Sequence, residues 1–149
     1  MERNIRNVMA VIDFIESHLC EKLELETVAK GVQYSKYHLH RMFAETVGLT
    51  IHDYVRRRQL TEAAKLLVFS DKPILEIALS AGYESQQSFT DSFKAMYKKS
   101  PGAYRAEKAF YPLQLRYILQ ENQISLKENR WQEKIVLATE EDIPQWMEL

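Results

Sequence analysis

The sequence predicts an all-α protein in which two helix-turn-helix units are joined by a long helix. Three observations support this fold class. Apolar residues recur at spacings of three and four up to about residue 105, which is the period of amphipathic helices. Glycine, proline and capping residues interrupt this pattern at intervals that suit short helices. The pattern also occurs twice, at an offset of about 50 residues, which indicates an internal duplication.

The first unit contains three predicted helices. The opening helix has apolar residues at every third or fourth position, namely Ile5, Val8, Met9, Ile12, Ile15 and Leu19. A shorter helix is expected from Leu23 to Lys30, followed by a turn at residues 31–34. A left-handed conformation would be strained for Gln33, so we expect this turn to differ from its counterpart in the second unit. Ser35 is a good N-cap for the third helix.

A long helix follows the first unit, from Ile51 to about Phe69. Gly48 is a helix stop before it, and Thr50 is its N-cap. Nineteen residues give a helix about 28 Å long. Pro73 interrupts the pattern and suits the first position of the next helix.

The second unit repeats the first. Residues 28–29 correspond to 77–78 at an offset of 49, and the offset becomes 50 after the turn. The later pairs are Ser35 with Ser85, Leu39 with Phe89, Phe43 with Phe93, Thr50 with Ser100, and Tyr54 with Tyr104. The inserted residue falls in the turn, where an insertion costs least, and Gly82 supplies the turn glycine of the second unit.

Two polar helix faces become comparable through this repeat. Leu39, Met42 and Phe43 form an apolar stripe, and Lys36, Tyr37, His40 and Arg41 lie opposite to it at about 100° per residue. The corresponding residues of the second unit are Gln86, Gln87, Thr90 and Asp91. Arg pairs with guanine, Gln with adenine and Thr with either base. We therefore predict that the two helices read DNA in successive major grooves, about 34 Å apart.

Composition and charge agree with a globular binding protein. The chain has 149 residues, of which 46% are hydrophobic and 28% charged, with a net charge of −1. Residues 30–105 have 12 Lys and Arg against 7 Asp and Glu, whereas residues 106–149 have 5 against 8. A basic middle segment suits a polyanion-binding surface. No signal peptide or membrane span is evident, and we expect the single Cys20 to be a small buried residue in a cytoplasmic, nucleoid-associated protein.

Several motifs together resemble the AraC/XylS family, and most closely its stand-alone activators of the MarA, SoxS and Rob type. The motifs are residues 34–43, the linker segment Tyr54-Val55-Arg56-Arg57-Arg58, residues 77–78 and 82–89, Phe93-Lys94, and residues 100–105. They occur in family order and spacing over about residues 5–106. The resemblance implies about seven helices, a DNA-binding domain at residues 1–106, and binding as a monomer to an asymmetric site of about two turns. It also implies activation of transcription through RNA polymerase.

The resemblance assigns roles to individual residues. It places Tyr37, His40 and Arg41 at base-contacting positions of the first recognition helix, and Gln86, Gln87, Thr90 and Asp91 at those of the second. It places Thr50 and Gly102 where helix N-termini meet phosphates. We expect the complete set of phosphate contacts to be Ser35, Lys36, Thr50, Arg56, Ser85 and Gly102.

Two departures from the family pattern affect the predicted readout. Tyr37 and His40 stand where the similar activators have Trp and Gln, so the bases read should differ. Asp91 stands where they have Arg. Phosphates repel a carboxylate, although it can accept a hydrogen bond from a cytosine amino group. We therefore expect the first recognition helix to dominate affinity.

Other chemical interpretations are weaker. His38 and His40 point about 160° apart on a helix and cannot share a metal ion. No nucleophile–base pair, phosphate-binding loop or paired carboxylate is evident, so we predict no enzyme activity, cofactor or metal. Residues 56–58 either clamp phosphates or form a solvated face, and at most two of them can face DNA; we favour Arg56. The aromatic residues at regular positions are expected in the core: Phe43, Phe69, Phe89, Phe93, Tyr54 and Tyr104.

The acidic tail, residues 107–149, leaves several interpretations open. It begins as a connector with apolar residues at Leu113, Leu115, Tyr117, Ile118 and Leu119. Residues 135–143 resemble a strand leading into a helix, as at the start of GNAT-type acetyltransferases. The tail lacks glycine, so the pyrophosphate loop of such enzymes is absent. The tail is either the start of a truncated second domain, acetyltransferase-like or effector-sensing, or a short native tail that packs on the DNA-binding domain or forms a dimer contact.

Overall fold

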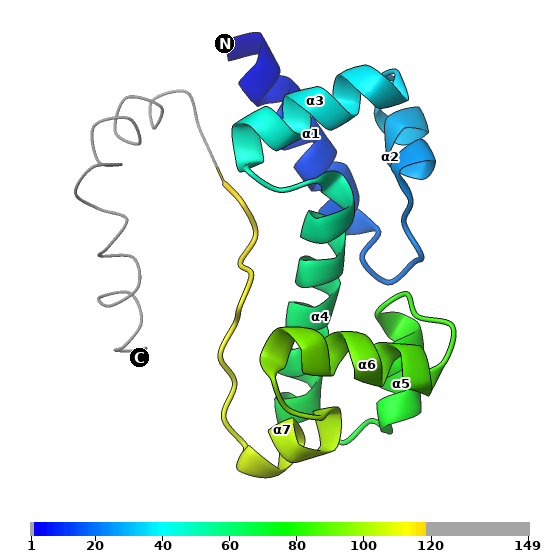
Figure 1. Ribbon diagram of the computed structural model, residues 1–149, viewed down its shortest axis with the longest axis vertical. Coiled ribbons are helices and arrows are strands. Elements are labelled where there is room, and N and C mark those ends of the chain that lie inside the picture. Colours follow the sequence, from blue (N-terminus) through cyan, green and yellow to red (C-terminus); the bar gives the residue numbers. More distant parts are fainter. Residues whose placement is uncertain (1, 119–149) are drawn as a thin grey trace, which may run out of the picture.

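The computed structural model describes residues 2–118, which form seven α-helices without a strand in that range (Figure 1). The helices are α1 Glu2–Ser17, α2 Leu25–Val32, α3 Lys36–Val47, α4 Ile51–Phe69, α5 Ile74–Ser80, α6 Gln86–Tyr97 and α7 Pro101–Glu107. The predicted all-α fold with a long central helix is confirmed. The strand predicted at residues 135–143 lies outside the described residues.

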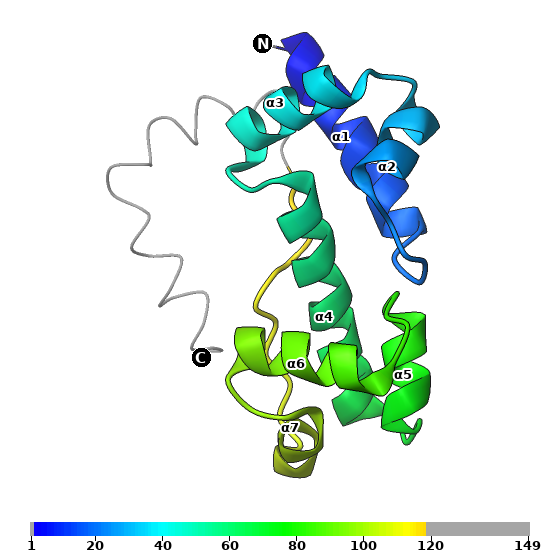
Figure 2. The same ribbon diagram turned by 45° about the vertical axis from the view of Figure 1, so that its right-hand side comes forward.

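Each helix-turn-helix unit has its own hydrophobic core. The first core is formed by α1, α2, α3 and the first turns of α4, and it includes the predicted stripe Leu39, Met42 and Phe43. The second is formed by the later turns of α4 with α5, α6 and α7, and it includes Phe89 and Phe93. Since α4 contributes to both cores, it joins the two units, as Figure 2 shows. None of the helices in the described part is long and apolar enough to cross a membrane.

The helix ends follow the predicted caps. The hydroxyl groups of Ser35, Thr50 and Ser85 accept hydrogen bonds from the backbone N–H three residues later, at 3.0–3.2 Å. The helix predicted at residues 23–30 is α2 and begins two residues later. Leu23 is buried in the first core but lies before the helix, because Glu24 is extended at the N-cap position.

The first turn has the left-handed conformation that was predicted to be absent. Gln33 has φ 64° and ψ 40°, and the next N–H, that of Tyr34, donates to the carbonyl of Ala29 at 3.0 Å. In the second unit Gly82 has φ 89°, and the N–H of Tyr83 donates to the carbonyl of Ala78 at 3.1 Å. The two turns therefore have equivalent geometry. In both units the chain needs a left-handed residue at this position to end the first helix of the helix-turn-helix. In the first unit this requirement outweighs the strain on Gln33.

Gln33→Gly should raise the free energy of unfolding by about 1 kcal/mol, because glycine adopts positive φ without the clash of a Cβ atom. Urea denaturation followed by circular dichroism measures this change. Gly48→Ala is a matched control, since Gly48 has φ 88° and a Cβ atom there would meet nothing within 4 Å. It should lower stability by a similar amount, about 1 kcal/mol. A destabilising Gln33→Gly would contradict the argument.

Two predicted core residues lie at the surface. Phe69 is 69% exposed, because it is the last residue of α4 and extends past the second core. Among the aromatic rings of residues 2–118, it meets that of Phe110 in an edge-on arrangement. Cys20 is exposed because it lies in the loop between α1 and α2. The other five aromatic residues predicted in the core, Phe43, Tyr54, Phe89, Phe93 and Tyr104, are buried.

Residues 109–118, here called the strap, run back along α4 from α7 toward the first unit (Figures 1 and 2). Tyr117 packs against the first core, while Leu113, Leu115 and Ile118 are exposed. The apolar residues of this segment therefore do not form a core of their own. Leu119 lies outside the described residues.

Candidate nucleic-acid interface

The two helices predicted to recognise DNA occupy equivalent places in the two units. Helices α3 and α6 both lie across the direction of α4, one toward each of its ends (Figure 2). Each is 12 residues long, and each begins at a serine N-cap. Each buries its apolar stripe in the core of its own unit, so the opposite face is left for a ligand.

The outward face of α3 has long side chains. Tyr37, His40 and Arg41 are all exposed, and Tyr37 is 79% exposed. Within residues 2–118, the side chains of His40 and Arg41 have no hydrogen-bond or ion-pair partner in the protein. A guanidinium group with unused donors is suited to the O6 and N7 atoms of guanine.

Lys36, at the start of α3, is paired with a residue of α2. Its Nζ lies 3.1 Å from the Oε2 of Glu26, and both side chains are exposed. The hydrogen bond to the Glu26 carboxylate, together with its charge, raises the pKa of Lys36 above its usual value. A phosphate could replace Glu26 as the partner of this ammonium group, at little cost because the pair is solvated.

The outward face of α6 differs in chemistry. Gln86, Gln87 and Asp91 are exposed and Thr90 is half-buried. The Nε2 of Gln87 donates to the Oδ1 of Asp91 at 2.9 Å. Since a carboxylate only accepts hydrogen bonds, this contact uses one N–H of the Gln87 amide and leaves its Oε1 and its second N–H for other partners. The α6 face thus includes a carboxylate at Asp91, whereas the α3 face includes the guanidinium group of Arg41.

The predicted phosphate contacts lie at helix N-termini. Ser35, Thr50 and Ser85 cap α3, α4 and α6, and Gly102 is the second residue of α7, where an added Cβ atom would meet nothing within 4 Å. The first N–H groups of a helix lack intrahelical acceptors and favour anions. The N–H groups at these positions can therefore donate to phosphate oxygens. The hydroxyl groups of Ser35, Thr50 and Ser85 already accept the capping hydrogen bonds.

The three consecutive arginines have different environments. Arg56 is half-exposed, with its Nη2 atom 3.7 Å from the carboxylate of Asp53. Arg57 donates to the Oε1 of Gln114 and to the carbonyl of Leu113 in the strap. This contact leaves Arg56 as the arginine of the run that can reach a phosphate.

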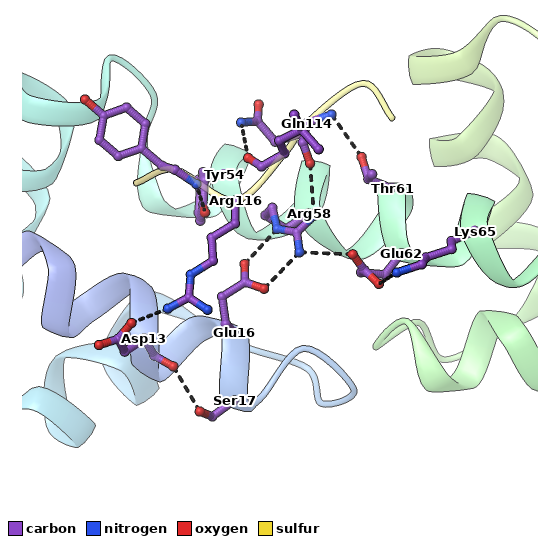
Figure 3. A network of polar contacts seen from close by, with 12 residues as sticks. Asp13, Glu16, Ser17, Tyr54, Arg58, Thr61, Glu62, Lys65, Gln114 and Arg116 are labelled. Carbon is purple, nitrogen blue, oxygen red and sulfur yellow. Dashed lines mark hydrogen bonds and ion pairs between the residues drawn. The ribbon is translucent and has the colours of Figure 1, made fainter. Parts of the chain in front are cut away.

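Arg58 is buried, which sequence reasoning did not predict. Its guanidinium group donates to both carboxylate oxygens of Glu16 at 2.7 and 2.8 Å, to Glu62 at 3.0 Å and to the carbonyl of Gln114 at 3.0 Å (Figure 3). The i, i+4 spacing of Arg58 and Glu62 is visible in the sequence. The bond to Glu16, on another helix, requires the fold. Arg58 therefore holds α1, α4 and the strap together.

Comparison with known proteins identifies the class of this fold. A family model described as "Helix-turn-helix domain" matches residues 28–107, which is more than half of the chain. This chain also resembles several solved structures. One is the C-terminal domain of AraT, a response regulator from Geobacillus stearothermophilus. The TM-score is 0.67 and the sequence identity 28%, and the match covers 74% of this chain and 93% of that one. Another is the DNA-binding domain of the global transcriptional factor AdpA in complex with a target DNA, with a TM-score of 0.64 and 27% identity over 67% and 90% of the two chains.

Curated relatives are also similar in sequence. The chain is 44% identical over 98 residues to the transcriptional regulator YbfP of Bacillus subtilis, covering 66% of this chain and 33% of that protein. It is 35% identical over 131 residues to the right origin-binding protein of Escherichia coli, covering 88% and 43%. It is 38% identical over 104 residues to the transcriptional activator AarP of Providencia stuartii, covering 70% and 77%.

The chain belongs to the AraC family of helix-turn-helix regulators. It spans a third of the length of YbfP and less than half of that of the right origin-binding protein. The match to the latter covers 131 of the 149 residues, so it necessarily extends past α7 into the tail.

Proposed function

We propose that this protein is a sequence-specific regulator of transcription that inserts α3 and α6 into successive major grooves of double-stranded DNA. The observation that carries the proposal is the placement of two serine-capped helices, each with its apolar stripe buried, toward opposite ends of α4. A 19-residue helix is about 28 Å long, which is close to the 34–36 Å between successive major grooves on one side of B-DNA. One protein molecule could thus contact two turns.

The base contacts follow from the chemistry of the two outward faces. We assign Tyr37, His40 and Arg41 of α3 to one groove, where Arg41 supplies paired donors for guanine. The second groove receives the α6 residues Gln86, Gln87, Thr90 and Asp91. The Asp91 carboxylate on α6 favours the amino group of cytosine and is repelled by phosphates, so α3 supplies most of the affinity.

Phosphate contacts would fix the position of both helices on the duplex. The proposed residues are Ser35, Lys36, Thr50, Arg56, Ser85 and Gly102. They lie at helix N-termini or near the outward faces, where N–H groups and cations meet phosphate oxygens. Such contacts set register and orientation but not sequence preference.

Selection of binding sites from random duplexes tests the function. We expect an asymmetric site of about two helical turns bound by one protein molecule, with an affinity that falls steeply as salt rises because phosphate counterions are released. Binding without sequence preference, or with a flat salt response, would refute the proposal. Activation through RNA polymerase, in line with the activator AarP, is tested by in vitro transcription from a promoter that carries the selected site.

Asp91→Asn should strengthen binding by about 1 kcal/mol, or roughly fivefold, because it removes a negative charge that faces the DNA and keeps a side chain of the same shape. Fluorescence anisotropy on the selected site measures this change. Asp71→Asn, the same substitution in the loop between α4 and α5, should leave the affinity unchanged. Equal effects of the two substitutions would show that the position of Asp91 is immaterial.

A second proposal concerns the role of the tail, residues 107–149. The similarity to the right origin-binding protein extends past α7, while the chain covers 43% of that protein. The start of this segment, the strap, bonds to Thr61 and Tyr54 of α4, which supports the alternative that it packs on the DNA-binding domain. Isothermal titration with acetyl-CoA should show no binding to this chain. Saturable heat would support the acetyltransferase-like alternative.

A further inference from the structure

The relative orientation of α3 and α6 depends on whatever connects the two helix-turn-helix units. The buried side chains fall into two clusters with no member in common, and α4 is the helix that contributes to both. Units joined through one helix are expected to move relative to each other unless further contacts restrain them. Further contacts occur on two sides of α4, at residues 57–61.

On one side, the strap is bonded first to the second unit. The hydroxyl of Tyr97 donates to the carbonyl of Tyr111 at 3.1 Å and accepts from the N–H of Leu113 at 3.3 Å. The N–H of Gln114 donates to the hydroxyl of Thr61, which is buried in α4, at 3.1 Å. Since these groups are buried or half-buried, losing one of them costs more than losing a surface hydrogen bond.

The same strap is then bonded to the first unit. The N–H of Tyr117 donates to the hydroxyl of the buried Tyr54 at 2.9 Å, and the hydroxyl of Tyr117 donates to the carbonyl of Thr46, near the end of α3, at 3.2 Å. Arg116 pairs with Asp13 of α1 (Figure 3). The strap is thus bonded to both units, and it bonds to Arg58 of α4 between them.

On the other side of α4, the loop after α1 meets the turn of the second unit. The Nε2 of Gln59, which is buried, donates to the carbonyls of Leu19 and Glu21 at 3.0 and 2.8 Å. A Cβ atom at Gly82 would lie 2.8 Å from this Nε2 and 2.8 Å from the carbonyl oxygen of Glu21. The loop, α4 and the second turn are therefore in direct contact. Figures 1 and 2 show this loop and the strap on different sides of α4.

We propose that the strap and the Gln59 contact hold α3 and α6 in one fixed relative orientation, and that the protein thereby selects DNA sites by the number of base pairs between the two contacted segments. Contacts on two sides of a helix oppose its bending in either direction. The positioning residues are Tyr54 and Tyr97, which bond the strap, and Gln59, which bonds the loop. The DNA part of this proposal rests on the proposed function, whereas the fixed orientation does not.

Distance measurement between spin labels tests the fixed orientation without DNA. Labels on Glu45→Cys in α3 and Ala95→Cys in α6, in a Cys20→Ser background, report the separation of the two helices. The double variant Tyr54→Phe with Tyr97→Phe removes two of the hydroxyl groups that bond the strap and keeps both rings. We expect one narrow distance distribution for the parent and one at least about twofold broader for the double variant, since unrestrained units move. Tyr83→Phe, at a tyrosine of the second unit that makes no hydrogen bond to residues 109–118, is the matched control and should keep the narrow distribution.

Hydrogen exchange shows whether the substitutions have released the strap. The N–H of Tyr117 should exchange faster in the double variant, because it loses its acceptor. Faster exchange with an unchanged distance distribution would overturn the proposal. If the double variant does not fold, Thr61→Val takes its place, since it removes the acceptor of the Gln114 N–H and keeps the side-chain shape.

Spacing preference is the second measurement. A duplex with one base pair inserted between the two contacted segments rotates one of them by about a tenth of a turn. We expect the parent protein to lose about tenfold in affinity, comparable with one mismatched base pair. The double variant should lose less than about threefold. Equal losses of affinity in both proteins would overturn the proposed selection by spacing. A parent protein that selects no DNA site would instead refute the proposed function, and the distance measurement would still test the fixed orientation.

Discussion

Arg58→Ala should lower the free energy of unfolding by about 3–5 kcal/mol, the loss expected when one partner of a buried ion pair is removed. The Arg58 side chain is 6% exposed and that of Glu16 is 13% exposed. Burial lowers the pKa of Arg58, but the hydrogen bonds and charges of Glu16 and Glu62 more than offset this, so its pKa lies above the usual value. Without Arg58, the Glu16 carboxylate would remain buried with no cation bonded to it, and the strap would lose a donor at Gln114.

Urea denaturation monitored by circular dichroism measures this loss. Arg56→Ala is the matched control, because the Arg56–Asp53 pair is solvated and contributes at most about 1 kcal/mol. Replacing Arg58 and Glu16 together by leucine should recover a large part of the stability, since no buried charge then lacks a partner. A loss below about 1 kcal/mol for Arg58→Ala would show that the network is solvated in solution.

Arg41→Ala should weaken binding to the selected site by about 1–3 kcal/mol and relax the preference at one base pair. Arg41 is exposed on the outward face of α3 without a partner among residues 2–118, so the lost energy would come from the DNA contact and not from the fold. Fluorescence anisotropy on a panel of single-base variants of the site measures both effects. The thermal stability of the free protein should not change.

Lys36→Ala provides the contrast. Lys36 is assigned to a phosphate, so its loss should weaken binding to all sequences alike and reduce the slope of the salt dependence by about one. Gln87→Ala in α6 should cost less than Arg41→Ala, because α3 supplies most of the affinity. If Arg41→Ala weakened binding uniformly across the panel, Arg41 would contact phosphate and the assignment to a base would be wrong.

The sequence alone predicted the secondary structure because it depends on local interactions. A serine or threonine hydroxyl that accepts from the N–H three residues later acts within one helical turn, so Ser35, Thr50 and Ser85 marked helix starts correctly. The period of the apolar residues showed which face of each helix is buried. The duplication then made the two polar faces comparable, because equivalent positions in the two units have equivalent surroundings.

Periodicity does not show how far a core extends or which conformation a turn needs. Phe69 continues the apolar pattern of α4, but it lies two positions beyond Leu67, the last buried residue of the helix, where too little of the second unit covers it. Cys20 has a small apolar side chain, yet it is exposed because it lies in a loop. The backbone conformation of Gln33 was predicted from the preference of glutamine against positive φ, but the turn requires the left-handed conformation. At Gln33 the need to end α2 outweighed a local tendency of about 1 kcal/mol, whereas Phe69 and Cys20 lie where the fold leaves their side chains exposed.

The sequence by itself determined that this chain is a pair of helix-turn-helix units with one polar face in each. Only the tertiary structure decided how the units are held relative to each other. Arg58 bonds to a carboxylate 42 positions earlier, and the strap bonds to Tyr54, Thr61 and Tyr97 through backbone groups. Contacts of these two kinds have no sequence period, because they depend on which segments the completed fold brings together.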